Sequence, residues 1–147
     1  MRRRNAGVLG LLAAVSVISF AVHRSQALPA GPQPIGWDRE SCTECHMLIS
    51  DRHFAAQLQA ADGAIRNFDD PGCLMLYVGH QHTRLHAIYF LDSKSGQWLK
   101  SEETGFVRST GSPMGRGVAA VRKTLPGALS YAQALKNIEA ESSKEGM

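Results

Sequence analysis

The sequence lacks the motifs that mark several common enzyme classes. It contains no Gly-x-Ser-x-Gly nucleophile motif, no glycine-rich phosphate-binding loop and no zinc-protease motif. These absences argue against a serine hydrolase, a P-loop nucleotidase and a zinc protease, and nothing else in the chain points to a catalytic nucleophile. We therefore expect a protein that is not an enzyme.

Excess positive charge is absent from most of the chain. The 147 residues hold 16 Lys and Arg against 13 Asp and Glu, but four of the arginines lie within residues 1–27, which hold no acidic residue. Without that segment, 12 basic residues face 13 acidic ones, a net charge near −1. This balance gives no support to a nucleic-acid partner.

The N-terminus has the pattern of an export signal. Arginines at positions 2–4 precede the uncharged apolar run 7–22, and small residues at Ser25 and Ala27 suit a signal peptidase. We predict a signal peptide over residues 1–27, which places the protein in the periplasm. An uncleaved anchor is the alternative, because the apolar run is close to the shortest length that spans a membrane, and membrane association is expected only in that case.

The rest of the chain predicts one small domain of the α+β fold class. Residues 28–38 are a proline- and glycine-rich leader, residues 39–140 the domain, and residues 141–147 a flexible polar tail. Alternation and turn signals predict strand, strand, helix, strand, then strand, strand, helix. These are two small ββαβ-like halves with short antiparallel strands and one helix each. The expected strands are 54–60, 64–68, 86–91, 105–109 and 118–121; the helices start at Asp70-Pro71 and Ser130, and the first ends at Gly79.

The most distinctive stretch is a cluster of soft metal ligands. Cys42, Cys45, His46 and Met47 fall within six residues. Thiolate and thioether sulfurs favour Cu(I), zinc, iron–sulfur clusters or haem iron over magnesium and calcium. Cys45 and Met47 are two positions apart, so they share one side of an extended segment.

Met114 is a further candidate ligand, because it lies between Pro113 and Gly115 in a glycine-rich loop that offers no helical or strand face to bury it. Together with Cys45 and Met47 it would form a soft site with few ligands, suited to Cu(I).

The cysteine pair also leaves other uses open. Cys42-Thr43-Glu44-Cys45-His46 matches the C-x-x-C-H signature of covalent haem attachment, so a small c-type cytochrome, with Met114 as the second axial ligand, is the alternative function. Such cytochromes are largely helical, unlike the pattern here. A redox disulfide between the two cysteines is a third hypothesis, and structural zinc would need two more ligands. Cys73, on the first predicted helix, is expected to be a buried structural residue.

Four separated motifs together resemble the NosL family, the accessory proteins of nitrous-oxide reductase. The family's C-x-x-C-G-M pattern is similar to residues 42–47, its F-D-x-P to residues 68–71, its D-x-x-S-G-x-W to residues 92–98, and its P-M-G to residues 113–115. The resemblance spans roughly Cys42 to Ile138, with the motifs in the same order.

The resemblance implies a periplasmic metallochaperone that binds Cu(I) and delivers it to an acceptor cuproenzyme such as nitrous-oxide reductase. Its metal ligands would be Cys45, Met47 and Met114, with Cys42 as a helper or redox partner. The chain departs from the family in two respects. His46 stands where the family usually has glycine, which adds a potential ligand, and the family's lipoprotein cysteine is missing.

Overall fold

The structure is a computed structural model that describes residues 15–19 and 28–145. Residues 15–19 are helical and exposed, and the rest of the predicted signal peptide, with its cleavage site, lies outside the described residues. Within the described ranges, no helix combines the length and the apolar character needed to cross a membrane.

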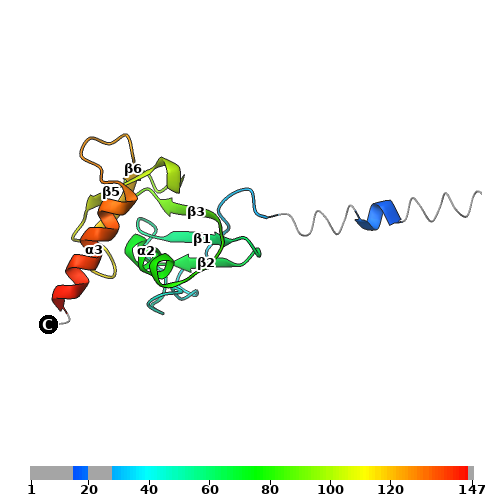
Figure 1. Cartoon of the computed structure of the whole chain (residues 1–147), viewed down its shortest axis with the longest axis horizontal. Helices are drawn as coiled ribbons and strands as arrows, with labels where there is room; N and C mark the ends of the chain where they lie inside the picture. Colours follow the sequence, from blue (N-terminus) through cyan, green and yellow to red (C-terminus); the bar gives the residue numbers. More distant parts are fainter. Residues whose placement is uncertain (1–14, 20–27, 146–147) are drawn as a thin grey trace, which may run out of the picture.

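A four-stranded antiparallel sheet forms the first part of the domain (Figure 1). Its strands lie in the order β2-β1-β3-β4, and β1 is buried along its whole length. The predicted hairpin between β1 and β2 is confirmed: Gly63 adopts a positive φ of 87°, and Asp62 Oδ1 accepts the Ala64 N–H at 3.0 Å. The strands are β1 (Ala56–Ala60), β2 (Ile65–Phe68), β3 (Leu85–Leu91) and β4 (Trp98–Lys100).

Helix α2 (Pro71–His80) follows β2 directly and packs against β1. Its predicted start is confirmed, because Asp70 caps it by accepting the Gly72 N–H at 2.6 Å, with Pro71 as the first helical residue. The predicted end at Gly79 is wrong. Gly79 keeps a helical conformation, and the helix stops only after His80.

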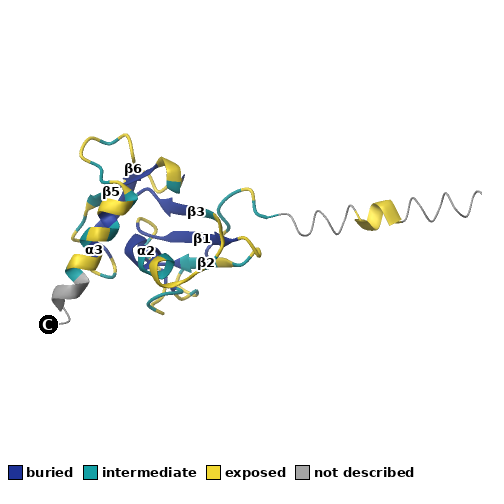
Figure 2. Ribbon diagram, viewed as in Figure 1, coloured by how far each residue is buried: buried dark blue, intermediate teal, exposed yellow. Residues whose placement is uncertain are grey.

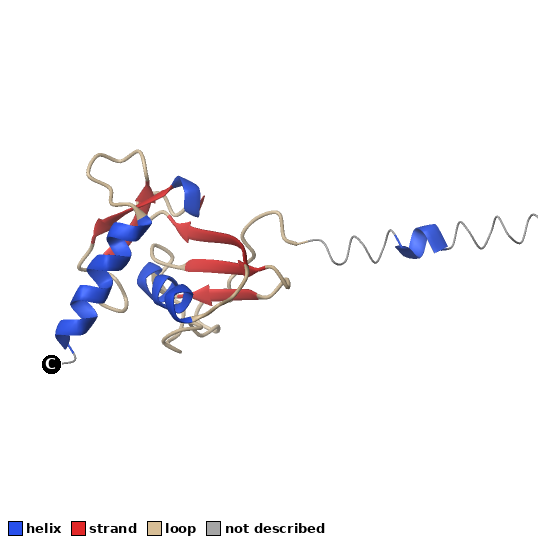
Figure 3. Ribbon diagram, in the orientation of Figure 1, coloured by secondary structure: helices blue, strands red, loops and turns tan. Residues whose placement is uncertain are grey.

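The second part of the domain is a two-stranded sheet with one helix (Figure 3). The short 3₁₀ helix η1 (Ser101–Glu103) leads into β5 (Thr104–Arg108), which pairs antiparallel with β6 (Val118–Arg122). Helix α3 (Tyr131–Glu145) packs on β5 and extends into the segment predicted as a tail. The α+β fold class is confirmed, and the second half is ββα over the residues that the structure describes.

A capping box opens α3, as the sequence predicts. Ser130 N–H donates to Gln133 Oε1 at 2.9 Å, and Gln133 N–H donates to Ser130 Oγ at 3.4 Å.

One core joins the two parts (Figure 2). The rings of Phe90 on β3 and Phe106 on β5 meet edge-to-face, with centroids 5.2 Å apart, and Tyr131 of α3 lies 6.1 Å from Phe106. Such aromatic pairs add about 0.5–1.5 kcal/mol beyond the area that they bury. Helix α2 contacts both β1 and β6, so its first turn lies where the two parts meet.

The end of the predicted leader belongs to the domain. Gln33 exchanges two hydrogen bonds with the buried Gln57 of β1, at 2.7 and 3.0 Å, and Gln59 donates to the Gly31 carbonyl at 2.8 Å. Ile35 is buried in the core. The leader therefore supplies hydrogen-bond partners to buried polar side chains on β1.

Gly72 should be intolerant of any side chain. A Cβ at this position would lie 2.7 Å from the Arg116 Cβ, in the loop that precedes β6. We expect Gly72→Ala to lower the free energy of unfolding by about 1–3 kcal/mol, because the loop must move away from the helix. Gly79→Ala, at a position with nothing within 4 Å, is the matched control and should be neutral or stabilise by up to about 1 kcal/mol. Urea unfolding of both variants measures the difference, and equal effects would contradict it.

Candidate metal centre

The soft-ligand motif folds into a tight turn. An isolated β-bridge pairs Ser41 with Leu48, Cys42 N–H donates to the Met47 carbonyl at 2.7 Å, and His46 N–H donates to the Cys42 carbonyl at 3.0 Å. Within this turn Cys42 is buried, Cys45 is half-buried, and His46 and Met47 are exposed. The turn thus points one cysteine inward and the following methionine outward.

The turn requires an unusual backbone conformation at His46. Its φ is 63°, in the left-handed region that glycine adopts freely and other residues adopt at a cost. The backbone at position 46 therefore suits the glycine of the C-x-x-C-G-M pattern better than it suits a histidine.

Hydrogen bonds hold this turn against the end of β2. Thr43 N–H donates to the Asn67 carbonyl at 2.9 Å, and Asn67 Nδ2 donates to Glu40 Oε2 at 2.6 Å. Ser50 N–H donates to Asp69 Oδ1 at 3.3 Å. Since α2 begins two residues after Asp69, these bonds bring the cysteine motif beside the first turn of α2.

Three cysteine sulfurs meet at that point. The Sγ atoms of Cys42, Cys45 and Cys73 all lie within 4.8 Å of one another, and all three residues are free thiols. A metal ion bound at about 2.3 Å in the plane of three sulfurs would hold them about 4 Å apart. The spacing therefore suits one soft metal ion after a small contraction.

Cys73 is the residue that sequence reasoning missed. It is buried, as expected, but it contacts the cysteine motif from 28 residues further along the chain. Its position just after the cap Asp70 and Pro71 was a usable signal, because a helix start fixes the direction of its first side chains. The contact of Cys73 with Cys42 and Cys45 depends on the long-range hydrogen bonds between β2 and the cysteine turn, which the sequence does not show.

The electrostatics of the cluster are asymmetric. The Cys42 sulfur accepts a hydrogen bond from the Cys73 thiol and further ones from the backbone N–H groups of Cys45, Asp69 and Glu44. Because these donors stabilise the thiolate, the pKa of Cys42 falls to about 5 although burial alone would raise it. The hydrogen bond that the Cys73 thiol donates to Cys42 raises the pKa of Cys73, and burial adds to this rise. Burial raises the pKa of Cys45, and the neighbouring Cys42 adds to this. The hydrogen bonds thus favour the thiolate form at Cys42, and burial with the neighbouring sulfur favours the thiol form at Cys45 and Cys73.

The two predicted methionine ligands lie in different segments, Met47 in the cysteine turn and Met114 in the loop before β6. The Met47 N–H donates to the Cys45 sulfur, and the Met47 side chain is 51% exposed. The Met114 N–H donates to the Asp70 carboxylate, which also accepts from Ser112 Oγ. Met114 is half-buried against the core. The 112–117 loop is therefore fixed to the start of α2, three residues before Cys73, while ligation by either methionine stays a prediction.

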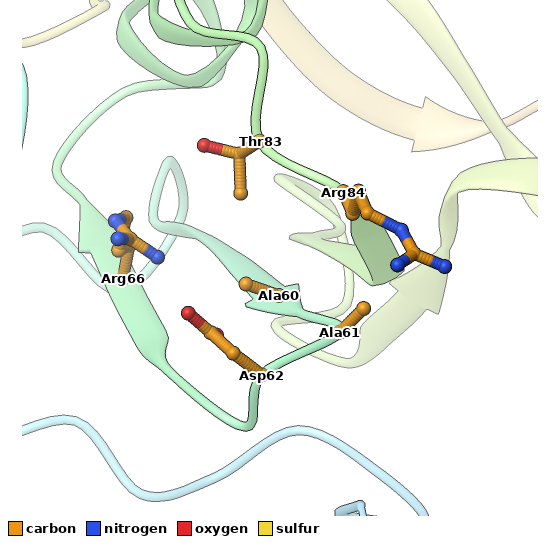
Figure 4. A pocket seen from close by; sticks show the side chains of 6 residues that line it. All are labelled: Ala60, Ala61, Asp62, Arg66, Thr83 and Arg84. Atoms are coloured by element: carbon orange, nitrogen blue, oxygen red, sulfur yellow. The ribbon is translucent and has the colours of Figure 1, made fainter.

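A separate hollow of about 360 Å³ lies at the opposite end of the β1–β2 hairpin (Figure 4). It is lined by Ala60, Ala61, Asp62, Arg66, Thr83 and Arg84. Figure 4 shows the Arg84 guanidinium pointing away from Asp62 and Arg66. None of these residues is a soft ligand, so the hollow does not belong to the thiol cluster.

Stability of the metal-free, reduced protein should depend on pH through Cys42. Its pKa of about 5 in the folded state, against 9.0 when unfolded, means that the folded state binds fewer protons between those values. The free energy of unfolding therefore rises with pH across this window, and the contribution is lost below it. Cys73, whose pKa is raised, affects the pH dependence of stability only above pH 9.0. We expect Cys42→Ser to flatten the rise in urea unfolding, whereas an equally steep rise would contradict the assignment.

Glycine at position 46 should stabilise the protein. His46→Gly removes the penalty of a left-handed residue with a side chain, so we expect a gain of about 1 kcal/mol in the free energy of unfolding. Asp38, with a φ of 58°, provides a control at which Asp38→Gly should gain less, because Asp tolerates this region better. Thermal and urea unfolding measure both, and a loss of stability in His46→Gly would show that the imidazole makes stabilising contacts.

Comparison with known proteins supports the fold. No family model matches the chain, and no curated protein sequence matches it. Among solved structures, the chain is similar to the crystal structure of the copper chaperone NosL from Shewanella denitrificans, with 16% sequence identity and a TM-score of 0.51. The alignment covers 77% of this chain and 88% of that chain. The three-cysteine cluster therefore lies in a NosL-like fold.

Proposed function

We propose that this chain is an exported Cu(I)-binding metallochaperone that passes copper to an acceptor cuproenzyme, such as nitrous-oxide reductase. The observation that carries the proposal is the meeting of three free thiols within 4.8 Å. The similarity of the fold to a copper chaperone supports it. Copper is here the cargo of the protein, and no catalytic step is involved.

The donor set favours a soft ion over a hard one. Three sulfurs suit Cu(I) or zinc and have little affinity for magnesium or calcium. Zinc in structural sites takes four ligands in a tetrahedron, whereas the thiol cluster offers three. Met47 and Met114, the predicted thioether ligands, suit Cu(I), whereas zinc is usually bound by Cys, His, Asp and Glu.

The position of Cys45 suits release by ligand exchange. Cys45 is half-buried, and the exposed Met47 follows it in the turn. A ligand from the acceptor can bind the copper from this side, while Cys42 and Cys73 are buried behind it. Copper stays Cu(I) throughout, so the transfer needs no oxidant or reductant.

The proposed location depends on the N-terminal segment. An export signal over residues 1–27 would place the thiol cluster in the periplasm together with the acceptor. Membrane association follows only if that segment is retained.

Covalent haem attachment is less well supported by the geometry. Haem attachment needs both motif cysteines to be accessible to the haem edge. Cys42, however, is buried, and its sulfur accepts hydrogen bonds from the Cys73 thiol and from backbone N–H groups. The arrangement fits a small ion better than a macrocycle.

Copper binding is tested by titrating the reduced, exported protein with Cu(I) against a chromophoric chelator. We expect one equivalent to bind, and Cys45→Ser to weaken the affinity by at least about tenfold because a direct ligand is lost. Met75→Leu, a buried methionine on α2, is the control and should bind as wild type does. If Cys45→Ser bound Cu(I) as tightly as wild type, or if the exported protein carried a covalent haem band, the proposal would fail.

A further inference from the structure

The thiol cluster and Met47 form a graded series from the inside of the protein to its surface. Cys42 and Cys73 are fully buried, Cys45 is half-buried, and the Met47 side chain is 51% exposed. Hydrogen bonds link neighbouring members of the series. The Cys73 thiol donates to the Cys42 sulfur, and the Met47 backbone N–H donates to the Cys45 sulfur. Cys45 is thus intermediate in burial between the two inner cysteines and Met47.

Resting on the function proposed above, we propose that copper occupies two positions that share Cys45. The inner, storage position is formed by Cys42, Cys45 and Cys73. The outer, transfer position is formed by Cys45 and Met47, from which the acceptor takes the ion.

The inner position is rigid because its sulfurs are fixed by the fold. Cys42 lies in the turn closed by its own N–H bond to the Met47 carbonyl at 2.7 Å. Cys73 lies in the first turn of α2, which is held by the Asp70 cap. A set of three sulfurs in which Cys42 and Cys73 are fixed and buried binds tightly and releases slowly, because few motions open it to an incoming ligand.

The outer position is mobile and open. The Met47 side chain has three rotatable bonds and stands in solvent, so it can approach the Cys45 sulfur with little obstruction. A thiolate and one thioether leave room around the ion for a ligand of the partner.

Copper moves from the inner to the outer position by ligand exchange alone, with no change in its oxidation state. The bonds from copper to the sulfurs of Cys42 and Cys73 break, the bond to Cys45 is kept, and a bond to the Met47 sulfur forms. The Cys73 sulfur takes back a proton from water, and the Cys42 sulfur keeps its backbone N–H donors. The ion remains Cu(I) and then exchanges Met47 and Cys45 for ligands of the acceptor, and the released Cys45 sulfur takes up a proton from water.

The two positions predict that equilibrium affinity and release rate depend on different residues. We expect Cys73→Ser to weaken Cu(I) affinity by about 10–100-fold, because the storage position loses a ligand. Met47→Leu should leave the affinity within about twofold and slow release to a competing chelator by about tenfold, because only the exit step is impaired. Leu48→Ala, at the adjacent residue with 53% exposure, is the control and should change neither.

Chelator competition gives the affinities, and stopped-flow mixing of the copper-loaded protein with excess chelator gives the rates. X-ray absorption of loaded wild type, which should show three sulfurs around copper, tests the storage position even if Cys73→Ser does not fold. If wild type bound no Cu(I), the proposed function itself would fail. If wild type bound Cu(I) through fewer than three sulfurs, or Met47→Leu weakened affinity without slowing release, only the two-position proposal would be overturned.

Discussion

A single buried carboxylate, that of Asp70, ties together the start of α2 and the loop before β6, beside the three-cysteine cluster. It caps α2 through the Gly72 N–H, and it accepts the Ser112 hydroxyl and the Met114 N–H from a loop more than forty residues away. These bonds fix the direction of the first turn of α2, and with it the Cys73 side chain. Burial raises the pKa of this carboxyl, and four donors, the Cys73 N–H being the fourth, oppose that rise. Hydrogen bonds thus hold the group in the interior, where it links the loop to the helix start.

Local signals predicted much of the fold. The Asp70-Pro71 helix start, the Ser130 and Gln133 capping box and the Asp62-Gly63 hairpin turn are each set by interactions within a few residues, so the sequence contains them directly. The end of α2 was misjudged because a glycine permits a helix end without requiring one.

The candidate site was predicted less completely, because its geometry depends on contacts far apart in the chain. The motif around Cys42 and Cys45 was recognisable from composition and spacing. Cys73 joins it through long-range hydrogen bonds, such as those of Thr43 to Asn67 and of Ser50 to Asp69, which no local pattern encodes. The role of position 46 was likewise hidden, because a histidine there suggests a ligand, whereas the backbone shows a turn that favours glycine.

The polar contacts between the leader and β1 set where the described chain enters the domain. Leu28 lies beside the Gly63 turn, and Gln33 bonds to Gln57 further along β1, so the chain enters at the turn end of the hairpin. The cysteines lie at the other end, beside Asp69. The point where the described chain enters the domain and the three sulfurs are therefore separated by the length of the hairpin, so the two ends of this sheet are free to face different surroundings.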